Sequence, residues 1–324
     1  MSSDLLLSIC ILSYNQPKEV ERLLESIASQ VAPAVEVLIR DDSTNDETLF
    51  VVEKFSRSFP IRYFRGKKEG IDKTIIFLTI EAKGKFVWWM GDDVIVPDGI
   101  TSILRVINKY VNHVTFIWAN YRLFNGEKLA IDLPIDQFFK SRDQVLELGG
   151  AALGFVSSTI IKRDSVLSGI EKSKKHVGSA FVNLYLVLHV ISQPGDHYYV
   201  RGEVVICHPT TSADAKASVV DRNGVINNWA FQVFGINFAV IVNEFSKTFS
   251  RQARRKTIKR SFGQTWRGMV VAYVGGWDSP RGKRIQMIRH FWTFPECWVA
   301  LVLFAMPRAV LERMYKIYKK IYNK

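Results

Sequence analysis

The chain has 324 residues, a formal net charge of +13 and 48% hydrophobic residues, enough for one large α/β domain with an extension or for two modest domains. Its three cysteines are too widely spaced for a disulfide framework or a zinc motif, so a reducing compartment is expected. The positive charge calls for an anionic partner, and nucleic acid and anionic lipid are the two obvious kinds.

The first 110 residues alternate short apolar runs with helical patterns. We predict strands at Leu5–Leu12, Val35–Arg40, Ile61–Phe64 and Phe86–Met90, and helices at Lys18–Gln30, Glu47–Phe55, Thr74–Ala82 and Ile100–Tyr110. Because strands and helices alternate, we expect a mostly parallel sheet with right-handed crossovers and flanking helices, which is an α/β fold. The apolar run at residues 5–12 reads as a strand, so no secretory signal is expected.

Two adjacent carboxylates, Asp92 and Asp93, follow the strand Phe86–Met90 after one glycine. Ligands of open α/β sheets bind at the carboxyl ends of such strands. Two neighbouring carboxylates repel each other, and both ionise cheaply only when a cation or many donors lie between them. Hard oxygen ligands suit Mg²⁺ or Mn²⁺, which bind few carboxylates together with phosphate oxygens. The pattern therefore indicates a divalent metal that holds a nucleotide diphosphate, and the alternative is an Asp-Asp cap before a surface turn.

Polar turns also follow the first two strands of the predicted sheet. Ser13 and Tyr14 come after the first strand, and Asp42 follows the second. The carboxyl ends of parallel strands meet at one edge of a sheet, so these turns are expected beside Asp92 and Asp93. This clustering favours a ligand site over an isolated surface turn.

Three segments, Ser8–Asn15, Glu36–Asp46 and Trp88–Asp98, resemble the nucleotide-sugar domain of family 2 glycosyltransferases in order and spacing. The combination of Trp89–Asp93 with Gly154–Ser158 resembles the abequosyltransferase-type branch of O-antigen enzymes, and the resemblance as a whole covers roughly Leu5–His189. The resemblance implies a GT-A (Rossmann-like) fold. It also implies a hexosyl- or deoxyhexosyltransferase that uses a nucleotide-sugar donor and a polyprenyl-diphosphate-linked glycan acceptor in bacterial surface polysaccharide, O-antigen or lipopolysaccharide synthesis.

The same resemblance assigns roles to the polar turns. Ser13 and Tyr14 would lie against the nucleotide base, and Asp42 would accept a hydrogen bond from it. Asp72 and Lys73 occupy a segment where the family often places a donor-binding residue. The structural alternatives are turn formation for Ser13 and Asp42 and a solvated helix position for Lys73.

For the metal, the resemblance points to the acidic pair. Asp92 would contact the ribose and the metal, and Asp93 would bind Mg²⁺ or Mn²⁺ and take part in catalysis. The family's commonest form is Asp-x-Asp, whose first acid would fall at Met90. The metal site here therefore relies on Asp92 and Asp93.

The catalytic base is the least defined part of the site. An inverting enzyme of this family usually carries an acid near the start of the helix that we expect at Gly178–Ile191, where this chain has Ser179. The base must reach the acceptor hydroxyl directly or through one water, and His176 is the nearest residue with a suitable pKa. Asp143 and Glu147 are further candidates if their loop folds over the site, and His176 could instead be a solvated loop residue.

We expect residues 1–210 to form the GT-A domain, with a nucleotide-sugar half at 1–112 and an acceptor half at 113–210. Residues 211–324 would form a helical, basic and aromatic region. It contains a basic run, Lys247–Arg260, a Trp-rich apolar run, Phe291–Met306, and a basic amphipathic tail, Arg308–Lys324. The apolar run falls short of the ~20 residues that span a bilayer.

Aromatic residues beside a basic amphipathic tail indicate an interfacial helix on an anionic membrane. The structural alternative is a helical subdomain whose charged face is solvated. The functional alternative is a basic nucleic-acid- or membrane-binding module without catalysis. The charge peaks beside the Trp-rich run, which favours lipid, so we expect no nucleic-acid partner and a peripheral position on the cytoplasmic face of the inner membrane.

Overall fold

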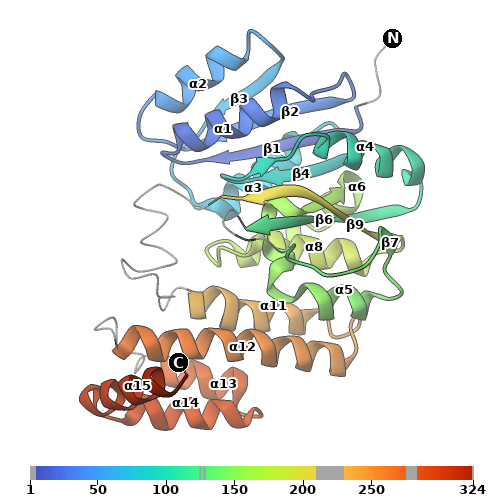
Figure 1. Cartoon of the computed structure of the whole chain (residues 1–324). Helices are drawn as coiled ribbons and strands as arrows, with labels where there is room; N and C mark the ends of the chain where they lie inside the picture. Colours follow the sequence, from blue (N-terminus) through green and yellow to red (C-terminus); the bar gives the residue numbers. More distant parts are fainter. Residues whose placement is uncertain (1–4, 124–125, 127–128, 209–229, 275–282, 323–324) are drawn as a thin grey trace. The chain divides into compact units, whose positions relative to one another are not determined.

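The computed structural model describes residues 5–123, 126, 129–208, 230–274 and 283–322 (Figure 1). The chain divides into two compact units. The N-terminal unit comprises residues 1–212 and 247–249, and the C-terminal unit comprises residues 213–246 and 250–324.

The described part of the N-terminal unit is built on a nine-stranded sheet in the order β3-β2-β1-β4-β8-β6-β9-β5, with β7 paired to β9. The strands are β1 (Leu7–Ser13), β2 (Val35–Asp41), β3 (Ile61–Arg65), β4 (Phe86–Met90), β5 (Val94–Ile95), β6 (Val114–Leu123), β7 (Gln137–Phe138), β8 (Thr159–Lys162) and β9 (Asp196–Cys207). Strands β1 to β4 are mutually parallel, as expected. The second half is mixed, because β8 runs antiparallel to both β4 and β6, and β5 and β7 run antiparallel to β9.

The helices of this unit are α1 (Pro17–Ala28), α2 (Glu47–Phe55), α3 (Ile71–Glu81), α4 (Gly99–Tyr110), α5 (Arg142–Gly149), α6 (Arg163–Leu167), α7 (Ile170–Ser173) and α8 (Val182–Ser192). All eight elements predicted for the first 110 residues are present. Helix α8 begins at Val182 rather than at Gly178, because Gly178 and Ala180 have positive φ angles of 92° and 56°. Such angles cannot continue a right-handed helix.

Alternate side chains of β1 pack on opposite faces of the sheet. Leu7, Ile9 and Ile11 join a buried cluster with apolar residues of α1, α2 and α4. Cys10 points to the other face, where its thiol donates to the carbonyl of Leu78 in α3. Helices therefore cover both faces, and Cys10 is a buried core residue.

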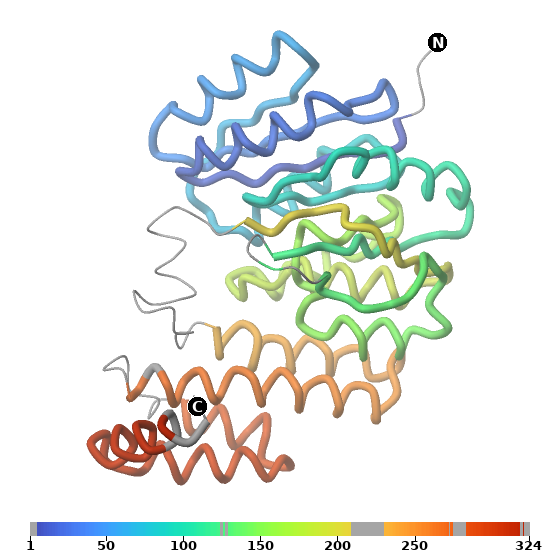
Figure 2. Tube along the Cα trace, in the orientation of Figure 1, coloured from blue at the N-terminus to red at the C-terminus, as the bar shows by residue number. Residues whose placement is uncertain are grey.

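The C-terminal unit is helical, as expected. It contains a π-helical turn (Phe231–Asn237) that leads into α11 (Phe238–Glu244), then α12 (Arg251–Val274), α13 (Arg284–Phe291), α14 (Pro295–Ala305) and α15 (Arg308–Tyr322). Helices α11 and α12 pack side by side (Figure 2). Phe262 of α12 stacks on Phe291 of α13 with ring centroids 4.3 Å apart. Within the described residues, none of the helices is both long and apolar enough to cross a membrane.

Candidate functional site

The sheet brings the first two polar turns together. The parallel register aligns Ser13 of β1 with Asp41 of β2, and Ile11 of β1 with Met90 of β4. The backbone N–H of Asp42 donates to the carbonyl of Ser13 at 2.9 Å. The three strands therefore end at one edge of the sheet, as their order predicted.

The first acidic pair, Asp41–Asp42, is surrounded by cationic and hydroxyl donors. Asp41 is fully buried and accepts hydrogen bonds from Tyr63 Oη at 2.8 Å and from Arg65 Nη1 at 3.0 Å. Asp42 accepts from Arg40 Nε at 3.0 Å and from Thr74 Oγ1 at 2.7 Å. Each carboxylate thus has an arginine partner, which offsets the cost of its burial.

The surroundings of Asp42 leave little room. Its Oδ1 lies so close to Gly66 that a Cβ atom on that residue would stand 1.9 Å away, so only glycine fits there. Arg40 also pairs with Glu69 at 2.9 Å, and its guanidinium lies 4.6 Å from the ring centroid of Phe77. These contacts fix Asp42 in place, and its hydrogen bond to a nucleotide base stays a prediction.

The second acidic pair, Asp92–Asp93, has different neighbours. Asp93 is only 2% exposed. Its carboxylate accepts hydrogen bonds from Ser157 Oγ, from the Cys207 thiol and from the backbone N–H of His208, the last at 3.1 Å. These three partners are neutral. Burial, reinforced by the charge of Asp92, raises the pKa of Asp93 to about 7.

Arg22 and Ser157 belong to this site, although the sequence assigned no role to either. Arg22 of α1 donates through Nη2 to the backbone oxygen of Asp92 at 2.8 Å, and its buried Nε has no hydrogen-bond partner among the described residues. Ser157 lies in the segment 154–158 that carried the family resemblance. No local sequence pattern points to Arg22, because its contact joins residues 70 positions apart.

The donor set of the Asp92–Asp93 pair fits a divalent cation. The buried Asp93 carboxylate, with neutral hydrogen-bond partners and the negative charge of Asp92 beside it, ionises readily only near positive charge, and Mg²⁺ and Mn²⁺ prefer carboxylate oxygens. No cluster of three or more His, Cys, Asp or Glu side chains among the described residues is arranged to hold a metal. Asp92 and Asp93 would therefore share the ion with oxygens of a diphosphate and of water, as is usual for Mg²⁺.

The other predicted donor-binding residues lie near the first pair. Ser13 Oγ is 3.5 Å from Thr48 Oγ1, and the ammonium group of Lys68 lies 4.4 Å from the ring centroid of Tyr14. Lys73 is half exposed and pairs with Glu69 at 2.9 Å. The donor-binding roles of Ser13, Tyr14 and Lys73 stay predictions.

Asp72 connects α3 to the loop that precedes α8. Its buried carboxylate accepts three backbone N–H groups, from Gly178 at 2.8 Å, Ala180 at 2.9 Å and Val182 at 3.0 Å. Burial raises the pKa of Asp72, and these hydrogen bonds oppose the rise. They fix the loop that carries Ser179. A contact of Asp72 with the donor stays a prediction.

The surroundings of the candidate bases differ from those predicted from the sequence. His176 is buried, with its ring centroid 4.8 Å from that of Tyr185, so the alternative of a solvated loop histidine is wrong. Ser179 Oγ accepts from the N–H of Phe181 at 3.1 Å. Asp143 and Glu147 stand on helix α5 rather than on a loop, because Ser141 caps that helix by accepting from the N–H of Gln144. The identity of the base stays a prediction.

Comparison with known families gives one match that includes both acidic pairs. Residues 8–167 match the family described as glycosyl transferase family 2. The matched region contains β1 to β4, both acidic pairs and Ser157.

Relatives of known name are found among bacterial transferases. The abequosyltransferase RfbV of Salmonella typhimurium is 25% identical, over 63% of this chain and 66% of its own length. The UDP-Glc:alpha-D-GlcNAc-diphosphoundecaprenol beta-1,3-glucosyltransferase WfgD of Escherichia coli is 25% identical, over 39% of this chain and 50% of its own length. The chain thus spans about two thirds or less of the length of these relatives.

Two solved structures share the fold. TarS residues 1–349 from S. aureus, in complex with UDP-GlcNAc, align over 96% of this chain and 91% of that one, with a TM-score of 0.65 and 15% identity. The mannosyltransferase PcManGT from Pyrobaculum calidifontis, in complex with GDP-Man and Mn²⁺, aligns over 98% and 87%, with a TM-score of 0.50 and 10% identity. These likenesses establish a GT-A fold for the chain.

Proposed function

Because residues 8–167 form a family 2 glycosyltransferase domain, we propose that the chain transfers a sugar from a nucleotide-sugar donor to a lipid-linked glycan acceptor, with a divalent metal at Asp92 and Asp93. The observation that carries this proposal is the buried Asp93 carboxylate beside Asp92, with neutral hydrogen-bond partners, at the carboxyl edge of β4. The family 2 domain also favours an enzyme over a binding module without catalysis.

In the proposed reaction, the bond between the sugar and the diphosphate breaks and a bond to an acceptor hydroxyl forms. The departing diphosphate gains negative charge, which a bound Mg²⁺ or Mn²⁺ would offset. Asp92 and Asp93 would hold that ion, and Ser157 orients Asp93 through its hydroxyl hydrogen bond. The buried Nε of Arg22, which has no partner among the described residues, is a further donor beside Asp92.

The acceptor hydroxyl must lose its proton to a base. His176 remains our candidate, next to the loop that Asp72 holds. Replacing His176 by Gln should lower turnover on the order of 10²- to 10⁴-fold with little change in donor affinity. A variant that turns over as fast as wild type would exclude His176 as the base.

The donor and the metal can be tested together. Wild-type protein should hydrolyse or transfer from one member of a panel of nucleotide sugars in the presence of Mg²⁺ or Mn²⁺, and Asp93→Asn should lose at least about 10²-fold in rate. Asp98→Asn is a matched control, because Asp98 is exposed and its left-handed backbone (φ 63°) suits asparagine. Equal rates for the Asp93→Asn and Asp98→Asn variants would contradict the proposal.

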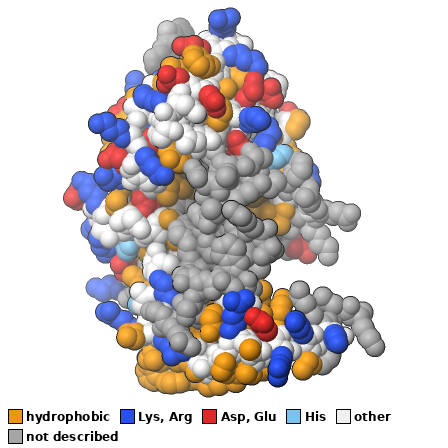
Figure 3. Space-filling model, turned by 90° about the vertical axis from the view of Figure 1, so that its left-hand side faces the viewer, with side chains coloured by type: hydrophobic (Ala, Val, Ile, Leu, Met, Phe, Trp, Pro, Cys, Tyr) orange, Lys and Arg blue, Asp and Glu red, His pale blue; other side chains and the backbone are white. Residues whose placement is uncertain are grey.

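The lipid-linked acceptor is supported by the surface of the C-terminal unit. Large apolar side chains are exposed on α13, α14 and α15 and just after α13, among them Ile285 at 80%, Trp292 at 60% and Val302 at 59%. Figure 3 shows hydrophobic side chains gathered on this unit, with basic side chains near them. Exposed Trp residues beside Lys and Arg are typical of a surface that lies in a membrane interface. The name of the relative WfgD includes a diphosphoundecaprenol-linked sugar.

Membrane docking can be separated from the transfer reaction. Replacing Trp292 and Val302 by Ser should weaken binding to phosphatidylglycerol-containing vesicles by at least about tenfold, because less apolar area is removed from water. Phe50→Ser is the control, since Phe50 is 64% exposed on α2 of the N-terminal unit. If Phe50→Ser weakened vesicle binding equally, the proposed docking surface would be wrong.

A further inference from the structure

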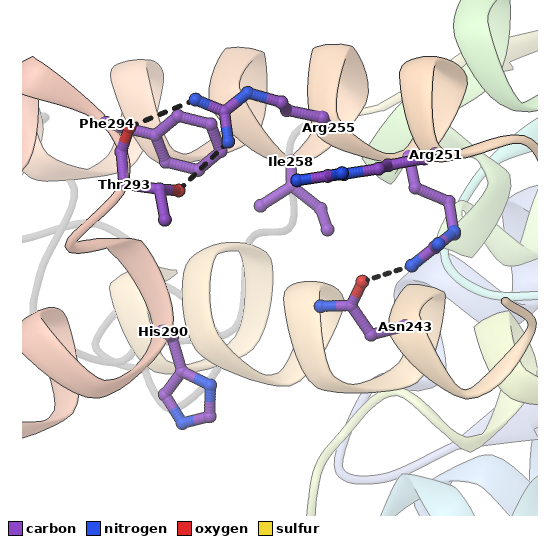
Figure 4. Close-up of a pocket in the computed structure, with 8 residues that line it drawn as sticks. Asn243, Arg251, Arg255, Ile258, His290, Thr293 and Phe294 are labelled. Atoms are coloured by element: carbon purple, nitrogen blue, oxygen red, sulfur yellow. Dashed lines mark hydrogen bonds between the residues drawn. The ribbon is translucent and has the colours of Figure 1, made fainter.

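A basic cavity lies entirely within the C-terminal unit. It has a volume of about 220 Å³, and its walls come from α11, α12, α13 and the residues that join α13 to α14 (Figure 4). Arg251, Arg254, Arg255 and His290 line it, and none of the described residues that line it is acidic. The positive charge of three guanidinium groups favours the binding of an anionic ligand in this cavity.

Hydrogen bonds hold two of these arginines in position. Arg254 Nη1 donates to Asn243 Oδ1 at 2.8 Å, which ties α12 to α11. Arg255 donates to Thr293 Oγ1 at 3.2 Å and to the Thr293 carbonyl at 3.0 Å, and its guanidinium lies 4.9 Å from the ring centroid of Phe294. Neither the hydroxyl nor the carbonyl of Thr293 neutralises the charge of Arg255. Its guanidinium is oriented while its charge remains for a ligand.

Arg251 contributes a third guanidinium. It is the first residue of α12, and it forms no hydrogen bond or ion pair with any of the described residues. Figure 4 shows Arg251 on α12 and Asn243 on α11, on opposite sides of the cavity. The positive end of a 24-residue helix lies at the same place and also favours negative charge. Of the three arginines, Arg251 is therefore the one that forms the fewest hydrogen bonds within the described part of the chain.

The size of the cavity limits the ligand. A volume of about 220 Å³ exceeds the ≈30 Å³ share of one water, but it is smaller than the ≈300–1,000 Å³ typical of sites for drug-sized ligands. A whole nucleotide sugar is therefore too large. Guanidinium forks match the oxygens of phosphate in geometry and charge, and several forks suit a group that carries more than one negative charge.

We propose that this cavity binds a phosphoryl group, either as free phosphate or as the phosphate of a lipid headgroup. The site is separate from the Asp92–Asp93 pair, because all of its lining residues belong to the C-terminal unit. The inference therefore does not depend on the proposed sugar transfer.

The test titrates inorganic phosphate into the full-length chain by calorimetry, with sulfate-free buffer at fixed ionic strength. Arg251→Gln should weaken phosphate binding by about ten- to a hundredfold, the usual effect of losing a hydrogen bond to a charged group. Arg260→Gln is the matched control. Arg260 is exposed on the same helix and does not line the cavity, and its replacement removes the same charge. Arg251→Lys should fall between wild type and Arg251→Gln, because it keeps the charge without the fork.

A second arm distinguishes the two sources of phosphate. Vesicles of phosphatidylcholine with phosphatidic acid present a phosphate monoester, and vesicles with phosphatidylserine of equal charge serve as reference. Preference for phosphatidic acid that disappears in Arg251→Gln but not in Arg260→Gln would identify a headgroup site, and phosphate binding without that preference would identify a free-phosphate site. Equal losses in both variants, or binding of neither phosphate nor phosphatidic acid by wild type, would overturn the proposal. Thermal melts of each variant in phosphate-free buffer check that it is folded.

Discussion

Two Asp-Asp pairs follow parallel strands at the same edge of the sheet, yet their surroundings differ. Asp41 and Asp42 have Arg65 and Arg40 as partners, whereas the hydrogen bonds that Asp93 accepts come from a hydroxyl, a thiol and a backbone N–H. The first pair is compensated by the protein itself. In the second pair, Asp93 has neutral hydrogen-bond partners and the charge of Asp92 beside it, so its ionisation is favoured by added positive charge, which is the property expected of a metal site. The two Asp-Asp dipeptides thus have different chemical properties, because the fold places different groups beside each of them.

The largest expected effect on stability belongs to the compensated pair. Asp42→Asn removes the charged partner of Arg40, whose side chain is 9% exposed, and weakens the hydrogen bond from Thr74. Breaking a buried ion pair from one side costs about 3–5 kcal/mol, and the lower end is expected here because Arg40 keeps Glu69. Urea denaturation should report this loss. A change below about 1 kcal/mol would show that the pair is not held as described.

A smaller loss is expected at Asp72, a carboxylate compensated by backbone N–H groups rather than by arginine. Asp72→Asn leaves one carbonyl oxygen and turns an NH₂ group toward N–H donors, so at least one of the groups at Gly178, Ala180 and Val182 loses its acceptor. We expect a destabilisation of about 1–3 kcal/mol. Hydrogen exchange at Gly178–Val182 should accelerate more than exchange at α1. Uniform acceleration would contradict a specific role in holding the loop.

Replacement of Asp93 should change stability in the opposite direction. The folded pKa of Asp93, about 7, lies above the ordinary aspartate value of 3.8, so the folded state binds more protons between these values and stability falls as pH rises through that window. Asp93→Asn removes this penalty. In EDTA, we expect the variant to be more stable than wild type by roughly 2–4 kcal/mol at pH 8 and by much less at pH 4. A pH-independent difference would contradict the assigned cause.

The smallest effect is expected at Lys73. Its ion pair with Glu69 spans one helical turn at the surface, so Lys73→Ala should change the free energy of unfolding by less than about 0.5 kcal/mol. A change in donor affinity of the Lys73→Ala variant would therefore report on the predicted role of Lys73 in donor binding and not on a loss of stability. A loss of nucleotide-sugar binding without a loss of stability would support donor contact, and unchanged affinity would leave Lys73 as a surface residue.

Much of the nucleotide-sugar half could be predicted from the sequence, because its strands are short apolar runs and its helices are amphipathic. The positions of Ser13, Asp42, Asp92 and Asp93 at one edge followed from that order alone. The partners of these residues could not be predicted, because Arg22, Ser157 and Asp72 act across large sequence separations. The start of α8 was misplaced for a similar reason, since Asp72 stabilises a loop there in place of a helical turn.

We propose above all that the Asp92–Asp93 pair holds a divalent metal together with a nucleotide diphosphate. The most direct measurement is Mn²⁺ binding by electron paramagnetic resonance, with UDP or GDP present, for wild type, Asp93→Asn and Asp98→Asn. We expect wild type and Asp98→Asn to bind Mn²⁺ more tightly when the nucleotide is present, and Asp93→Asn to lose that gain. Equal Mn²⁺ binding by Asp93→Asn and wild type, or no dependence on either nucleotide, would contradict the account.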